Sequence, residues 1–118
     1  MVIAVVYVLV GMLLGGKMGA SGDHTLSGLH AHLNLVGFTL MMVFGLTYRS
    51  IPSMAEGRIG VSHFWLHQIG ALVMMVSLYL LFSETVAAAS IGPFLLLSEV
   101  LIIFGIVLFG LNLWRNAR

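Results

Sequence analysis

Four long runs of apolar residues, separated by short polar stretches, divide this chain into predicted helices. Each run is close to the ~20 residues that an α-helix needs to cross the hydrocarbon core of a bilayer. Glycine, proline and polar side chains fill the three gaps between the runs. The pattern therefore predicts four membrane-spanning helices, at about Val2–Ala20, His30–Ile51, Val61–Phe82 and Ile91–Trp114.

The three predicted loops are short. They comprise Ser21–Leu29, Pro52–Gly60 and Ser83–Ser90, and connections of this length join neighbouring helices that run in opposite directions. The chain contains no internal repeat and no low-complexity segment. We therefore expect an all-α fold, an integral membrane four-helix transmembrane bundle that forms a single domain over residues 1–118.

Composition agrees with a membrane protein and excludes several functions. Of the 118 residues, 60% are hydrophobic and 8% are charged, and the mean hydropathy is +1.11. A water-soluble domain of this length could not bury so much apolar surface, whereas a bilayer solvates it. The net charge of +1 argues against nucleic acid as a partner. The absence of cysteine excludes disulfides, thiolate-ligated haem and cysteine-ligated clusters.

The basic residues predict the orientation, because cytoplasmic loops of membrane proteins collect Lys and Arg. Arg49 and Arg58 flank the second loop, Arg115 and Arg118 lie at the C-terminal end, and only Lys17 lies on the other side. We therefore expect both termini in the cytoplasm and the protein in a bacterial cytoplasmic (inner) membrane.

Two histidines, His30 and His32, open the second predicted helix near the outer face. An imidazole inside a bilayer costs free energy unless it has a partner, so this pair is a candidate metal or cofactor site. Residues two apart in an α-helix project about 200° apart, so the two side chains cannot bind one ion from the same side. We expect each histidine to serve a different pocket, between two flat cofactors or between two subunits.

Three further histidines are secondary candidates. His24 lies in the first loop, where exposure to solvent is the favoured interpretation and a place near a cofactor or proton path is the alternative. His63 and His67 share one face of the third helix at a spacing that can hold a metal ion. A structural or interfacial role is favoured for this pair, which we expect on the cytoplasmic side, separated from His30 and His32 by most of the ~30 Å hydrocarbon thickness.

Glu99 is the one acid inside an apolar run. An ionised carboxylate in the membrane costs about 2.5 kcal/mol or more, so this side chain is expected to face the bundle, be protonated or find a partner. It either carries protons or tunes a cofactor, or it forms a hydrogen bond between helices. The sequence does not decide between these roles.

Gly11, Gly15 and Gly19 repeat at four-residue spacing along the first helix. Small residues at this spacing form a smooth strip that another helix backbone can approach closely. The strip fits a contact between copies of the chain, and it fits packing against the second helix equally well.

A series of motifs runs from the second predicted helix to the fourth. His30-x-His32 is followed by Gly45 and Pro52, then by Ser62-His63-Phe64 with Ile69-Gly70, and then by Ser90-Ile91-Gly92-x-Phe94. In order and spacing, these motifs resemble the last four transmembrane helices of the heme-copper oxidase catalytic subunit. The resemblance covers nearly the whole chain, and the His-x-His motif with its downstream glycine and proline is its most specific part. It implies that His30 ligates a high-spin haem and His32 a low-spin haem.

The chain lacks the earlier helices of that family, which supply the copper ligands and the second ligand of the low-spin haem. The family subunit arranges twelve helices as three arcs of four, so the resemblance implies that this chain forms a similar ring as a homo-oligomer, most simply a trimer. A haem of b type would then be held between His32 of one protomer and a histidine of the next. Copper is the less favoured cofactor.

Three function classes stay open. The favoured class is a membrane cytochrome with two imidazole ligands, which passes electrons from an unidentified donor. In the second class a five-coordinate haem reacts with O2 or NO, as in related oxygen and NO reductases, and the protein is an oxidoreductase. In the third class there is no haem, and the protein holds copper or zinc at His24, His30 and His32 or assists the assembly of a larger complex. Carbon monoxide binding separates the first two classes, and metal analysis identifies the third.

Overall fold

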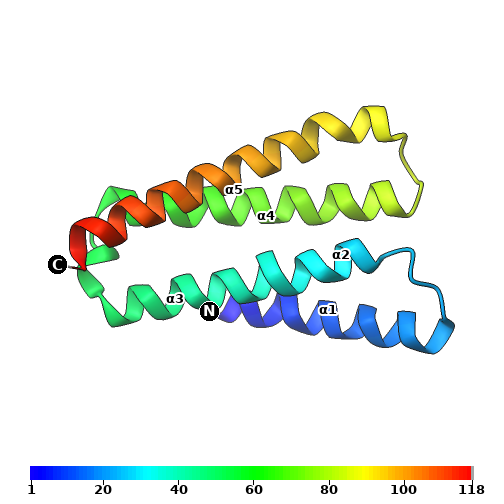
Figure 1. The fold of residues 1–118 in the computed structure, drawn as a ribbon, viewed down its shortest axis with the longest axis horizontal. Helices are drawn as coiled ribbons and strands as arrows, with labels where there is room; N and C mark the ends of the chain where they lie inside the picture. The colour runs from blue at the N-terminus through cyan, green and yellow to red at the C-terminus, as the bar shows by residue number, and fades with distance from the viewer. Residues whose placement is uncertain (118) are drawn as a thin grey trace.

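A computed structural model describes residues 1–117, which fold into helices joined by short connections (Figure 1). Four segments are long and apolar enough to cross a membrane, as the hydrophobic pattern predicts. The second of these segments is made of three consecutive helices, and a short 3-10 helix follows it. The elements are α1 (Val2–Ser21), α2 (Ser27–His32), η1 (Leu33–Leu40), α3 (Met41–Ser50), η2 (Pro52–Met54), α4 (Arg58–Phe82) and α5 (Ala88–Asn116).

Local residue chemistry sets several helix ends. Gly22 ends α1 in the left-handed conformation, with φ 70°, and its N–H donates to the carbonyl of Met18. Ile51, which precedes a proline, leaves the helical region with φ −127° and ψ 81° and so ends α3. The second and third spans begin earlier than the hydropathy pattern predicts, at Ser27 and Arg58.

The four spans lie as a flattened layer. The Cα atoms extend over 49 × 30 × 17 Å, and Figure 1 shows two antiparallel pairs, α1 with α2–α3 and α4 with α5. Within the layer, α4 lies between α2–α3 and α5. The four helices of the predicted bundle are therefore present, but they enclose little common interior. Arg118 lies outside the described residues, and the location of the termini relative to a membrane stays a prediction.

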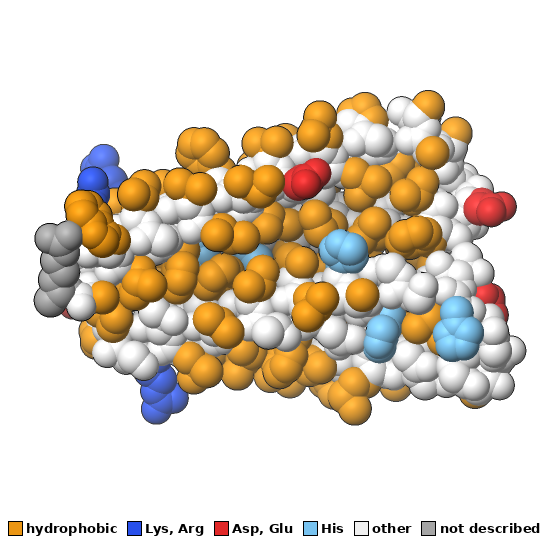
Figure 2. All heavy atoms as spheres, viewed as in Figure 1, with side chains coloured by type: hydrophobic (Ala, Val, Ile, Leu, Met, Phe, Trp, Pro, Cys, Tyr) orange, Lys and Arg blue, Asp and Glu red, His pale blue; other side chains and the backbone are white. Residues whose placement is uncertain are grey.

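Two small apolar clusters hold the pairs together. One joins Leu29 and Leu33 to Met75 and Leu78 of α4. The other is formed by the buried residues Ala4, Met41 and Ala71. Most other large apolar side chains are exposed, and on the face drawn in Figure 2 they cover all four spans. Lipid tails solvate such a surface.

Glycines allow the closest helix contacts. A Cβ atom on Gly11 would lie 2.6 Å from Oδ1 of Asn34, and one on Gly15 would lie 2.7 Å from Cε1 of His30, whereas Gly19 faces open space. Gly11 and Gly15 therefore serve packing within the chain, one of the two roles left open for the glycine strip. On α4, a Cβ atom on Gly70 would lie 2.8 Å from Cγ1 of Ile102 on α5.

We predict that Gly70→Leu separates α4 from α5 and lowers the free energy of unfolding by about 1–3 kcal/mol, the usual cost of overpacking. Gly110→Leu is the matched control, because a Cβ atom there meets nothing within 4 Å. Unfolding in a mild detergent, followed by circular dichroism, measures both variants. Equal stability of the two variants would contradict the close α4–α5 contact.

Candidate functional site

The segment directly after His32 is a π-helix, Leu33–Leu40, where the sequence predicts a uniform α-helix. Two side chains donate hydrogen bonds to its carbonyls. The hydroxyl of Thr39 donates to the carbonyl of Asn34 (2.9 Å), and Nε2 of His67 lies 3.2 Å from the carbonyl of Val36. Short π-helical turns are frequent at functional sites. The π-helix therefore marks this part of the second span as a candidate functional region.

His30 is held between α1 and α2. Its Nδ1 lies 2.8 Å from the carbonyl oxygen of Gly11. Because a carbonyl only accepts, Nδ1 carries the hydrogen and Nε2 carries the lone pair. The amide nitrogen of Asn34 lies 3.2 Å from that Nε2 and also donates to the backbone carbonyl of His30. Both nitrogens of His30 thus have partners within the chain.

His32 takes a different direction, as the two-residue spacing predicts. Its Nδ1 lies 2.8 Å from the carbonyl oxygen of Gly28, one turn earlier in the same helix. Nδ1 must donate, so Nε2 carries the lone pair. Among residues 1–117 the structure records no hydrogen bond to this Nε2, and the ring is half-buried. Metal-ligating histidines show this pattern, in which a carbonyl fixes one nitrogen and the other faces the metal.

His24 is exposed in the loop between α1 and α2, as the favoured interpretation predicts. In the same loop, the carboxylate of Asp23 accepts hydrogen bonds from the hydroxyl (2.6 Å) and the backbone N–H (3.0 Å) of Thr25. These bonds lower the pKa of Asp23 below its ordinary value. The carboxylate of Asp23 therefore gives this loop a negative charge at neutral pH.

His63 and His67 are buried, which agrees with the structural role that was one of the two favoured for this pair. Each is 2% exposed. Nδ1 of His63 is 2.9 Å from the hydroxyl of Tyr48, and Nε2 of His67 bonds to the carbonyl of Val36. The ring of Phe44 meets both imidazoles edge-on, with centroid distances of 4.6 and 5.1 Å.

His67 lies closer to His32 than the predicted separation of most of the bilayer thickness. The Val36 carbonyl that binds His67 lies only four residues after His32. Because α4 begins at Arg58, His67 is the tenth residue of a 25-residue helix. At 1.5 Å per residue it lies about 14 Å from the start of α4, near the middle of the span.

One nitrogen of each buried ring has no hydrogen-bond partner. These atoms are Nε2 of His63 and Nδ1 of His67. Because Nε2 of His67 donates to a carbonyl, its Nδ1 holds a lone pair that nothing in the described chain satisfies. Leaving such a group unpaired costs about 1–3 kcal/mol.

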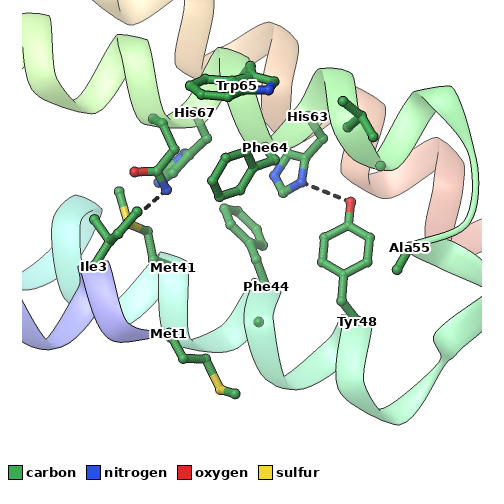
Figure 3. A pocket seen from close by; sticks show the side chains of 14 residues that line it. Met1, Ile3, Met41, Phe44, Tyr48, Ala55, His63, Phe64, Trp65 and His67 are labelled. Carbon is green, nitrogen blue, oxygen red and sulfur yellow. Dashed lines mark hydrogen bonds between the residues drawn. The ribbon is translucent and has the colours of Figure 1, made fainter.

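A cavity of about 420 Å³ adjoins these rings, between the start of α1, α3 and α4. Figure 3 shows both imidazoles extending from α4 toward Phe44, with the bond from Tyr48 to His63 drawn as a dashed line. Gln68 donates to the sulfur of Met41 (3.2 Å) in the same wall. The lining combines aromatic surface with a few polar groups, in the manner of ligand pockets, and includes Met41, Phe44, Tyr48, His63, His67 and Gln68.

Glu99 is exposed on the surface of α5, within its long apolar run. The structure records no hydrogen bond or ion pair from its carboxyl group to another described residue. The interhelical hydrogen bond that was one alternative is therefore not formed within residues 1–117. Its buried neighbour Ser98 donates to the carbonyl of Leu95 on the same helix (2.7 Å).

The described residues contain no group of three or more His, Cys, Asp or Glu side chains that could hold a metal ion. His24, His30 and His32 do not form such a group in the described residues. Sequence reasoning also missed two hydrogen-bond partners of the histidines, Asn34 and Tyr48. Asn34, four residues after His30 in an apolar run, was a detectable signal, whereas nothing in the sequence links Tyr48 to His63.

Comparison with known proteins gave no match: no family model fits the chain, and neither a curated protein nor a solved structure is similar to it. The motifs quoted above are therefore the whole basis of the resemblance to the heme-copper oxidase subunit.

We predict that, when neutral, His30 and His32 carry hydrogen on Nδ1 and His67 carries it on Nε2, because each of these atoms faces a carbonyl. Imidazole 15N NMR of histidine-labelled protein in detergent measures the tautomers, with single His→Gln variants for assignment. A neutral His67 that carries its hydrogen on Nδ1 would contradict the hydrogen bond from Nε2 to the Val36 carbonyl.

Proposed function

We propose that the protein is a haem-binding membrane protein of cytochrome type, in which His32 is an axial ligand of a b-type haem. The observation that carries this proposal is the hydrogen bond from Nδ1 of His32 to the Gly28 carbonyl, which turns the Nε2 lone pair outward. Imidazole nitrogen is a common axial ligand of haem iron, and bound haem supplies one-electron transfer.

The fit differs between the two histidines of the motif. His32 can ligate as it stands. His30 already bonds to Gly11 and Asn34, so ligation by His30 requires its ring to leave both partners. We therefore give His30 a positioning role, in which it fixes α2 against α1 and so sets the direction of His32.

A second copy of the chain is the proposed source of the second axial ligand. His30 is turned toward α1, and His67 is bonded to Val36, so neither is free to approach the same iron. The flattened layer leaves broad surfaces that a copy could cover. Glu99, exposed on the membrane-spanning helix α5, gives a further reason for association, because a neighbour would remove its carboxyl group from lipid.

We propose a bacterial cytoplasmic membrane as the location, with both termini inside and His32 toward the outer face. Arg49 lies in the last turn of the second span, Arg58 begins α4 and Arg115 lies in the last turn of α5, whereas Lys17 lies near the opposite ends of the helices. Cytoplasmic ends collect such basic residues. The electron donor and acceptor are membrane components that the site does not identify.

We predict that His32→Ala lowers haem content at least tenfold, because the free Nε2 is lost. His24→Ala is the matched control in the exposed loop and is expected to keep full haem. His30→Ala is expected to retain haem at lower stability. The ratio of haem absorbance to protein absorbance in detergent measures all three. Full haem in His32→Ala would contradict the ligand assignment, and a spectral change on adding carbon monoxide to the reduced protein would favour five-coordinate, gas-reactive haem.

We also predict that haem content and oligomerisation are linked, because a ligand that binds between copies stabilises the assembly by mass action. Native mass spectrometry in detergent is expected to show a haem-loaded oligomer, and His32→Ala is expected to shift the population toward monomer. A monomer that carries its full complement of haem would contradict a shared site.

A further inference from the structure

The buried pair in α4 has the arrangement of metal ligands. On each ring one nitrogen bonds to an oxygen atom, the Tyr48 hydroxyl for His63 and the Val36 carbonyl for His67. The other nitrogen of each ring is buried and has no partner. Histidines that bind metals use the same division, in which an outer oxygen accepts from one nitrogen and the other nitrogen ligates. The Val36 carbonyl can only accept, so Nδ1 of His67 holds the lone pair. The Tyr48 hydroxyl can donate or accept, and Nε2 of His63 ligates in the tautomer whose Nδ1–H donates to that hydroxyl.

The spacing of the two rings is also suitable. Residues four apart on a helix lie on one face, which is the spacing of paired histidines in helical metal sites. With metal–nitrogen bonds of about 2.0–2.1 Å, two imidazoles on one ion have ring centroids about 5–6.5 Å apart, from tetrahedral to linear geometry. The centroids of His63 and His67 are 6.2 Å apart.

The surroundings favour a soft or borderline ion. Met41, whose sulfur accepts a hydrogen bond from Gln68, lines the cavity beside the pair. No carboxylate side chain lines this cavity, and its side-chain donors include two imidazoles, an amide, a phenol and the thioethers of Met1 and Met41. Such donors suit copper and zinc better than magnesium or calcium, which take oxygen ligands.

We propose that His63 and His67 bind a d10 transition-metal ion, Cu+ or Zn2+, through Nε2 of His63 and Nδ1 of His67. Cu+ is the better match, because a thioether selects it and because it brings a single charge into the membrane interior. The site is separate from the proposed haem ligand, and the resemblance places His63 at a position that does not ligate in the family. The cavity supplies space for a further ligand.

The test uses the full-length protein without haem, purified in detergent after treatment with a chelator. Cu+ is titrated under anaerobic reducing conditions against a chromophoric copper chelator, and Zn2+ is titrated separately against a zinc dye. We expect one ion per chain. His63→Gln and His67→Gln are each expected to weaken binding at least tenfold, and Tyr48→Phe, which removes the outer partner of His63, is expected to weaken it about 10–100-fold.

A matched control locates the ion. His24→Gln, in the exposed loop, is expected to bind as tightly as the unmodified chain, and circular dichroism confirms folding of each variant. If a histidine variant does not fold, X-ray absorption of the metal-loaded unmodified chain replaces it and is expected to show two imidazole ligands. Tighter binding of Zn2+ than Cu+ with the same dependence on both histidines would assign the site to zinc. Absence of binding of either ion, or binding that His63→Gln and His67→Gln leave unchanged, would overturn the proposal.

Discussion

The need to pair polar atoms inside an apolar layer controls how the spans of this protein fit together. Imidazole nitrogens that leave water must find partners within the protein. His30 finds the carbonyl of Gly11, and this bond joins the second span to α1. His67 finds the carbonyl of Val36, and His63 finds the hydroxyl of Tyr48, which join α4 to the same span. Three histidines therefore connect three of the four spans.

The proposed functions follow from the imidazole nitrogens that these hydrogen bonds leave without a partner. Each neutral imidazole has one donor and one acceptor, and His30 uses both. His32, His63 and His67 each use only one nitrogen on the described chain. The free nitrogen of His32 belongs to a half-buried ring near the start of the second span. The free nitrogens of His63 and His67 are buried in α4. A large flat cofactor suits the position of His32, and a single ion suits the position of His63 and His67.

The sequence predicts the helices well and the contacts between them poorly. Four spans follow from apolar length alone, because a bilayer demands about 20 apolar residues per helix. The opposed directions of His30 and His32 follow from helical periodicity. The proximity of His67 to the segment after His32 depends on its bond to the Val36 carbonyl across two spans, which hydropathy does not indicate. The Phe44 and Tyr48 contacts depend on how α3 faces α4, and no pattern within one helix contains that information.

The π-helix at Leu33–Leu40 also sets the rotational register of the second span. Leu29, before it, and Leu33, its first residue, pack against Met75 and Leu78 of α4. Residues after it, Phe44 and Tyr48, meet the histidines of α4. Deleting one residue from a helix turns everything beyond it by about 100° relative to everything before. Loss of a single residue from the widened turn would therefore keep the span helical and yet point its far half away from α4, so chain length in this segment matters as much as side-chain identity.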